Sequence, residues 1–131
     1  MDIHPVGARA TSRGPESYFT GTVWLDPIVS APAPARVQAA RVTFAPGART
    51  AWHTHPLGQT LYVIAGAGRV QTRGGPVREI RAGDTVWIPP GEEHWHGATP
   101  EDFMEHLAML ENGDDPAATT TWLEHVTDDD Y

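Results

Sequence analysis

Glycine and proline interrupt this chain at short intervals, and their spacing limits which elements it can form. The 131 residues include 13 glycines and 12 prolines, which divide the apolar pattern into pieces of about five to eight residues. Many of these pieces are rich in β-branched and aromatic side chains, which favour strands. Helical periodicity is weak throughout. The pattern predicts an all-β fold of the sandwich or barrel type.

Eight segments are predicted as strands: residues 20–25, 36–44, 60–64, 68–72, 77–81, 84–88, 94–97 and 103–110. Residues 102–111 also have helical propensity, so a helix is the alternative there. The length fits one domain. We expect a barrel core of about residues 36–110 with arms of residues 1–35 and 111–131.

The composition excludes several kinds of catalysis. Cysteine is absent, which removes disulfides, thiolate metal sites and thiol nucleophiles. All nine basic residues are arginines, so no lysine can form a Schiff base. The three serines, at positions 12, 17 and 30, lie in no Gly-x-Ser-x-Gly turn, which argues against a serine triad. Histidine remains, with seven copies.

The net charge of −8 is unevenly distributed along the chain. Residues 1–91 carry a net +4, whereas residues 92–131 contain twelve acids and no arginine. An acidic chain repels phosphate backbones, so we expect no nucleic-acid partner. The acidic C-terminal segment is either a solvated tail or packs across an arginine-bearing face of this or a neighbouring subunit.

Targeting signals are not visible in the sequence. No apolar run approaches the ~20 residues that cross a membrane, and the start MDIHPVGARA does not match a signal peptide. We therefore expect no membrane partner and a cytoplasmic location.

Two segments bring histidines into spacings that suit a metal ion. In the first, His53 and His55 are two residues apart, which places both imidazoles on one face of a strand. Gln59 follows a Pro-Leu-Gly turn and can return beside them. In the second, His94 follows a Pro-Pro-Gly turn. Three imidazoles and one carboxamide oxygen suit a divalent first-row metal such as Mn, Fe, Co, Ni or Zn.

Together these segments resemble the two signature motifs of the cupins, which are small jelly-roll β-barrels. The matching positions are Gly47, His53, His55, Gln59 and Gly66 in the first motif, and Gly83, Pro89, Gly91 and His94 in the second. Ala98 stands where the second motif usually has asparagine. The resemblance implies a cupin barrel whose metal ligands are His53, His55, Gln59 and His94.

Position 59 departs from the usual glutamate of metal-binding cupins. A neutral glutamine leaves the formal charge of a divalent site at +2, which favours Lewis-acid chemistry over redox chemistry. The alternative is that Gln59 only lies beside three histidine ligands. The glutamine variant is similar to small bacterial cupins with hydroxynitrile lyase activity, which are manganese-dependent and act on aromatic cyanohydrins. This similarity extends over the whole chain.

The resemblance to these lyases also implies a catalytic base and a substrate pocket. They place an active-site histidine at the position of His106, which alternation puts on one face of the strand at 103–110; the alternative is a core histidine bonded to a backbone carbonyl. His96 is expected to be a pocket residue or a polar cap at the barrel mouth. The predicted pocket consists of Ala40, Val42, Thr50, Leu61, His96, Ala108 and Leu110. Its apolar character favours a small apolar or aromatic carbonyl-type substrate.

The leading hypothesis is therefore a metal-dependent lyase of the hydroxynitrile lyase type, with one divalent ion per chain. Mn²⁺ is favoured, and Fe²⁺, Ni²⁺, Co²⁺ or Zn²⁺ are alternatives. Two other functions stay open: an Fe- or Ni-dependent dioxygenase, and a metal-binding cupin without strong catalysis. We also expect a homodimer or homotetramer, because pairing of subunits covers exposed sheet edges.

Overall fold

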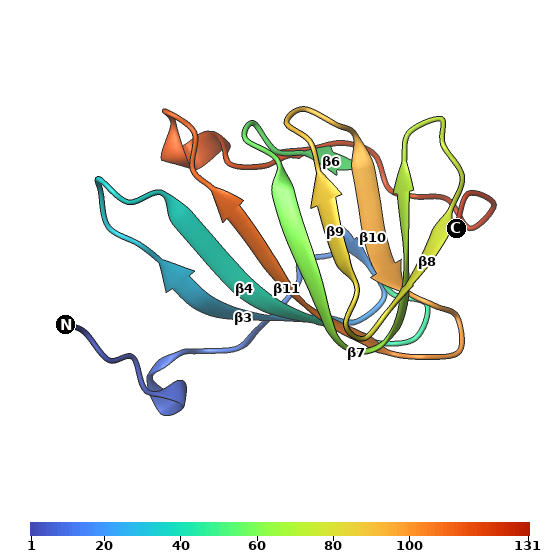
Figure 1. Ribbon diagram of the computed structural model, residues 1–131. Coiled ribbons are helices and arrows are strands. Elements are labelled where there is room, and N and C mark those ends of the chain that lie inside the picture. Colours follow the sequence, from blue (N-terminus) through green and yellow to red (C-terminus); the bar gives the residue numbers. More distant parts are fainter.

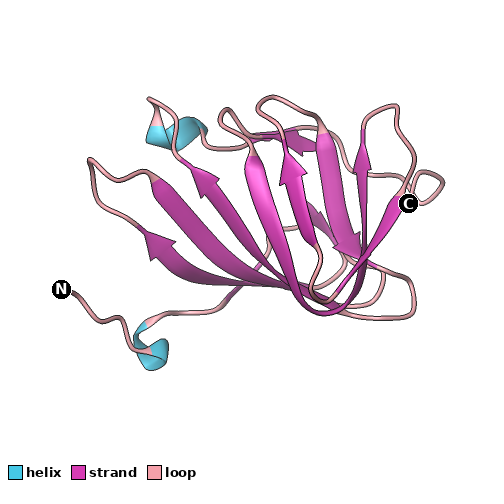
Figure 2. Ribbon diagram, viewed as in Figure 1, coloured by secondary structure: helices cyan, strands magenta, loops and turns pink.

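The computed structural model describes residues 1–131 and consists almost entirely of antiparallel strands (Figure 2). The strands are β1 (Ser12–Arg13), β2 (Phe19–Thr20), β3 (Val23–Ser30), β4 (Val37–Phe44), β5 (Arg49–Thr50), β6 (His53–Thr54), β7 (Gln59–Thr72), β8 (Arg78–Arg81), β9 (Thr85–Ile88), β10 (His94–Ala98), β11 (Met104–Glu111) and β12 (Thr121–Trp122). Two single turns of 3₁₀ helix, η1 (Val6–Ala8) and η2 (Pro116–Ala118), complete the chain. No helix has the length and hydropathy that a membrane span needs.

The strands form two walls that share β7. The first wall has the order β1-β3-β4-β11-β7, with β9 on the other side of β7. The second wall contains β8, the later part of β7, β10, β5 and β2, with β6 beside β10 and β12 beside β6. Figure 1 shows the walls meeting where β7 turns, at the bottom of the view. The all-β fold predicted from the sequence is confirmed.

A single long strand replaces two predicted ones. Residues 60–64 and 68–72 were expected as separate strands, but both lie in the 14-residue β7. The chain turns the corner at Gly66, which has a φ of +76°. A Cβ at Gly66 would overlap the carbonyl oxygen of Phe103, so both the conformation and the space require glycine.

Other predicted boundaries are also corrected. The strand expected at 20–25 is divided between β2 and β3 by Gly21, which has a φ of +79°. Residues 104–111 form β11, so the helical alternative there is wrong. Short strands at 49–50, 53–54 and 121–122 were not predicted, because two residues are too few to show a period.

The hydrophobic core fills the end of the barrel where the walls meet. Val23, Phe44 and Met104 lie opposite one another on β3, β4 and β11, and all three are fully buried. Beside them, Met104 pairs with the corner residue Gly66. This apolar row closes one end of the barrel and leaves the other end for polar side chains.

The acidic C-terminal segment packs against arginines of its own chain. Arg49 donates hydrogen bonds from Nη2 to the carbonyl of Val126 at 2.9 Å and to Asp128 at 2.7 Å. Arg73 forms an ion pair with Glu124 at 2.7 Å. Of the two sequence-based alternatives, packing across an arginine-bearing face is confirmed, and a fully solvated tail is wrong.

We expect Gly66→Ala to destabilise the protein by about 3 kcal/mol or more, because it adds a steric overlap to a left-handed backbone. Gly74→Ala is the matched control: Gly74 has a φ of +80°, but a Cβ there would meet nothing within 4 Å. The control should lose about 1–2 kcal/mol. Urea unfolding of both variants measures the difference, and equal losses would contradict the corner assignment.

Candidate metal centre

Three imidazoles converge at the open end of the barrel. β6 pairs with β10 so that His53 lies opposite His94, and their ring centroids are 4.2 Å apart. His55 follows β6 directly, with its ring 5.0 Å from that of His53 and 5.5 Å from that of His94. All three are at most 3% exposed. The His-x-His spacing therefore brings the rings together as predicted.

Backbone carbonyls determine which nitrogen of each ring faces the cluster. The Nδ1 atoms of His53, His55 and His94 lie 2.9, 2.9 and 2.8 Å from the carbonyl oxygens of Ala51, Thr119 and Glu92, in that order. A carbonyl oxygen can only accept, so each Nδ1 carries the proton. The Nε2 atom of each ring then has a free lone pair, which is the form that binds a metal.

The amide of Gln59 supplies a fourth donor at the same place. Gln59 is the first residue of β7 and is 4% exposed. Its Oε1 lies 3.3 Å from Nε2 of His94. Because both atoms carry lone pairs when His94 holds its proton on Nδ1, this approach is favourable with a cation bound between them.

The residues present fit a divalent first-row ion. The Nε2 atom of His55 is buried and has no hydrogen-bond partner, which is costly in the absence of a ligand. Three neutral imidazoles and one amide oxygen match the donors that Mn, Fe, Co, Ni and Zn accept. His53, His55, Gln59 and His94 could therefore hold such an ion.

Burial keeps these histidines neutral. Desolvation lowers the pKa of His94 to about 4 from the ordinary value of 6.5. Desolvation also lowers the pKa of His55. It takes the pKa of His53 well below 6.5, and there the neighbouring His94 and His55 add to the effect. Neutral imidazoles at pH 7 are ready to bind a metal.

A fourth histidine lies close enough to compete for the ion. Ring nitrogens of His53, His94 and His96 are all within 4.8 Å of one another. This set shares two members with the predicted ligands and contains His96 in place of His55. The sequence motif favours His55, and the carbonyl bond to its Nδ1 supports that choice.

His96 and His106 form a hydrogen-bonded pair beside the cluster. Nε2 of His106 lies 3.0 Å from Nδ1 of His96. His106 is fully buried, and desolvation lowers its pKa to about 4; the pKa of His96 falls well below 6.5 for the same reason. The ring of His96 is 5.2 Å from that of His53. His96 therefore lies between His106 and the predicted metal ligands, an arrangement the sequence did not indicate.

The predicted pocket residues lie on both walls of the barrel. Ala40, Ala108 and Leu61 are neighbours across β4, β11 and β7, and Val42 lies opposite His106 in the adjacent row. Leu110 lies opposite Gln59.

The remaining two predicted pocket residues come from the second wall. The hydroxyl of Thr50 lies 3.2 Å from the backbone nitrogen of His96 and accepts its hydrogen bond. Both residues are buried. The strand pairing thus places five of the predicted pocket residues on one wall, and Thr50 and His96 on the other.

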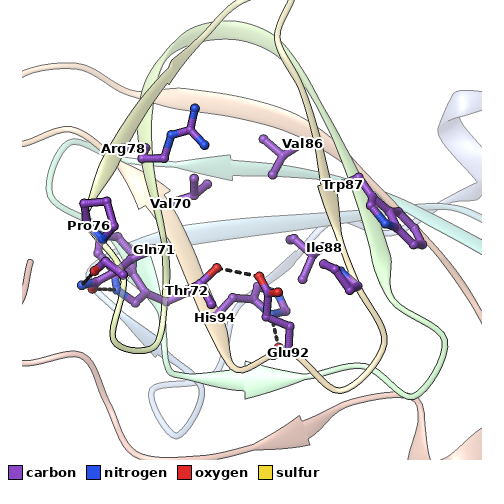
Figure 3. A pocket seen from close by; sticks show the side chains of 13 residues that line it. Val70, Gln71, Thr72, Pro76, Arg78, Val86, Trp87, Ile88, Glu92 and His94 are labelled. Atoms are coloured by element: carbon purple, nitrogen blue, oxygen red, sulfur yellow. Dashed lines mark hydrogen bonds between the residues drawn. The ribbon is translucent and has the colours of Figure 1, made fainter.

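A cavity of about 450 Å³ lies between β8 and β9 (Figure 3). Val70, Val86 and Ile88 form part of its apolar lining, and His94 also lines it. None of the seven predicted pocket residues lines this cavity. It reaches the histidine cluster from the side of the barrel.

Sequence reasoning missed the carbonyl groups that orient the metal histidines. Ala51 and Glu92 each lie two residues before the histidine they bind, so a local backbone pattern could have indicated them. The carbonyl of Thr119 is 64 residues from His55, and no local pattern points to it.

Known proteins resemble this chain in sequence and in fold. The Cupin domain family matches residues 40–109. The whole chain is 58% identical to an (R)-mandelonitrile lyase of Granulicella tundricola and covers 98% of that protein. The fold is similar to that of a cupin-like protein from Thermotoga maritima, with a TM-score of 0.86 and 39% identity over 100% of this chain and 95% of the other. The polyketide cyclase RemF from Streptomyces resistomycificus has a similar fold, with a TM-score of 0.76 and 18% identity over 100% and 90% of the two chains.

We expect the metal-free protein to lose stability as the pH falls from 6.5 toward 4. A histidine with a lowered pKa stays neutral when folded, whereas the unfolded chain takes up the proton, so acid favours unfolding. For His106, with a pKa of about 4, the loss between pH 6.5 and 5 is about 2 kcal/mol. Urea unfolding at both pH values should show a smaller loss for His106→Gln than for the wild type. An identical pH dependence would contradict the neutral buried imidazole.

Proposed function

This chain belongs to the cupin family, and we propose that it is a metal-dependent lyase of the hydroxynitrile lyase type. It would cleave and form cyanohydrins of small aromatic aldehydes. The observation that carries the proposal is the cluster of the buried rings of His53, His55 and His94, each with Nδ1 against a backbone carbonyl, which leaves the Nε2 lone pair of each ring free for a metal. The relative that is 58% identical over the whole chain is named (R)-mandelonitrile lyase, which supports the same reaction.

The metal we propose is one Mn²⁺ per chain, held by His53, His55, Gln59 and His94. A divalent ion bound there would act as a Lewis acid on the substrate oxygen and stabilise its negative charge. All four protein donors are neutral, so they do not reduce the positive charge of the site. This is why the donor set supports polarisation of a hydroxyl or carbonyl group.

His96 and His106 together are proposed to serve as the base. Nδ1 of His96 is occupied by His106, so the free atom facing the cluster is Nε2 of His96, which is buried without a partner. In cleavage, that Nε2 takes the hydroxyl proton of the cyanohydrin while the Nδ1 proton of His96 passes to Nε2 of His106. The lowered pKa values keep both rings neutral at rest and able to accept this proton.

The bond changes then balance with no further reactant. The C–CN bond breaks, cyanide leaves with the bonding electron pair, and the electron pair on oxygen forms the aldehyde C=O. The proton on His106 returns through His96 to cyanide and gives HCN. No oxidant is needed, which separates this reaction from that of a dioxygenase.

The substrate side chain is proposed to lie against the first wall. Ala40, Ala108 and Leu61 provide small and apolar surfaces there, and Val42 and Leu110 extend them. These residues offer no charge or hydrogen bond to a sugar or phosphate, but they suit a phenyl ring. The wall directly adjoins His106 and Gln59 through its strand pairing.

A second copy of this chain is proposed to cover the outer face of the first wall. Trp24, Tyr62 and Trp87 point outward from β3, β7 and β9 and are 48%, 43% and 60% exposed. Exposed apolar side chains gathered on one face of a sheet mark a surface for protein–protein contact. Covering them between two copies forms a homodimer, and pairing of dimers would form a homotetramer.

We expect His106→Ala to bind Mn²⁺ as the wild type does and to lose about 10²-fold or more in kcat for (R)-mandelonitrile, because His96 then has no partner that takes its Nδ1 proton while it accepts the substrate proton. His53→Ala should lose both Mn²⁺ and activity. His4→Ala, at an exposed position outside the barrel, is the control and should match the wild type. Benzaldehyde release without oxygen and bound manganese are measured for each.

Two outcomes would contradict the proposal. Full activity of His106→Ala with Mn²⁺ bound would remove the proton transfer from His96 to His106 from the mechanism. Absence of aldehyde from the Mn²⁺-loaded wild type would exclude this substrate, and product that forms only with oxygen would favour the dioxygenase alternative.

For the assembly, we expect Trp87→Glu to shift the protein toward the monomer, because a carboxylate would be buried in the aromatic interface. Light scattering coupled to gel filtration gives the mass of both proteins. A wild type that is monomeric at micromolar concentration would contradict the proposed interface.

A further inference from the structure

The C-terminal residues 119–131, here called the C-terminal strap, lie across the back of the metal histidines. Within the strap, β12 pairs with β6 so that Trp122 lies opposite His53. Leu123 donates to the carbonyl of Trp52 at 2.8 Å, and Trp52 donates to the carbonyl of Glu124 at 3.0 Å. The strap is thus a strand neighbour of the segment that carries the metal ligands.

Three strap residues contact the ligand rings themselves. Nδ1 of His55 donates to the carbonyl of Thr119 at 2.9 Å, and the hydroxyl of Thr120 lies 3.3 Å from the same atom. The ring of Trp122 lies 4.8 Å from that of His53. Only Thr119 and Thr120 lie within hydrogen-bonding distance of Nδ1 of His55, and Nε2 of His55 has no hydrogen-bond partner.

We propose that the C-terminal strap is the positioning element of the metal site, with Thr119 orienting His55 and Trp122 holding His53. This inference rests on the metal site of the proposed function. Without the Thr119 carbonyl, the His55 ring could rotate or carry its proton on Nε2, and the ion would lose a ligand. Groups that orient metal histidines in this way are typically worth 10- to 100-fold in metal affinity.

Trp122 is held in place by an aromatic cluster. Its ring stacks on Tyr18 at a centroid distance of 4.5 Å and meets Phe19 edge-on at 5.7 Å. Both partners come from the N-terminal arm, next to and within β2. The N-terminal arm and the C-terminal strap together therefore support His53 from behind.

The far end of the strap is anchored by a buried arginine. The Arg49 side chain is 5% exposed and binds the Val126 carbonyl and the Asp128 carboxylate. Its guanidinium lies 4.4 Å from the ring centroid of Tyr131, whose hydroxyl donates to the Ala98 carbonyl at 2.6 Å. A desolvated, multiply bonded cation of this kind is costly to release. Arg49 thus keeps the strap docked.

The test compares Trp122→Ala, Trp122→Phe and the matched control Thr121→Ala in the full-length protein. Thr121 is the exposed neighbour of Trp122 on the same strand. Arg49→Met is a second variant that releases the anchor without touching β12, and it serves if Trp122→Ala does not fold. Titration of Mn²⁺ into the metal-free proteins gives the dissociation constant, and the visible spectrum of the Co²⁺ forms reports the ligand geometry.

We expect Trp122→Ala and Arg49→Met to bind Mn²⁺ about tenfold more weakly, with altered Co²⁺ bands. Trp122→Phe should recover most of the affinity, and Thr121→Ala should equal the wild type. Folded variants that keep wild-type affinity and spectrum would overturn the positioning role while leaving the metal site intact. A wild type that binds no Mn²⁺ would instead overturn the metal site of the proposed function, and the inference with it.

Discussion

Removal of five imidazoles from water is the constraint on which the rest of this structure depends. His53, His55, His94, His96 and His106 are each at most 4% exposed, and burial penalises their charged forms. They persist because each ring uses one nitrogen in a hydrogen bond, three with carbonyls and two with each other. The Nε2 atoms of His53, His55 and His94 are left free for a metal ion, and Nε2 of His96 is left free to accept a proton. Burial thus keeps these rings neutral and able to bind.

The barrel sets where these rings meet. The apolar row of Val23, Phe44 and Met104 closes one end, and the corner at Gly66 lets β7 contribute to both walls. Along β11, the inward-facing residues that follow Met104 are His106 and then Ala108. The first wall thus carries His106 and the predicted apolar pocket residues, whereas the second wall carries His53, His94 and His96.

Much of the site could be predicted from the sequence, because its spacing is local. His53, His55 and Gln59 lie within seven residues, and the His-x-His spacing followed by a Pro-Leu-Gly turn keeps the three side chains close together. The convergence of His94 with them came from the resemblance to cupins rather than from any local pattern. The approach of Thr119 to His55 joins residues 64 positions apart, and β12 is only two residues long. Neither leaves a periodic signal, so only the folded chain reveals them.

The central claim is that His53, His55, Gln59 and His94 bind one metal ion while His96 is left to move a proton. Anomalous diffraction from crystals of the Mn²⁺-loaded protein tests this most directly, because it locates the ion among the five rings. The account predicts one ion per chain, bonded to Nε2 of His53, His55 and His94 and to Oε1 of Gln59. An ion bonded to His96 in place of His55 would contradict it, since His96 could then no longer accept the substrate proton.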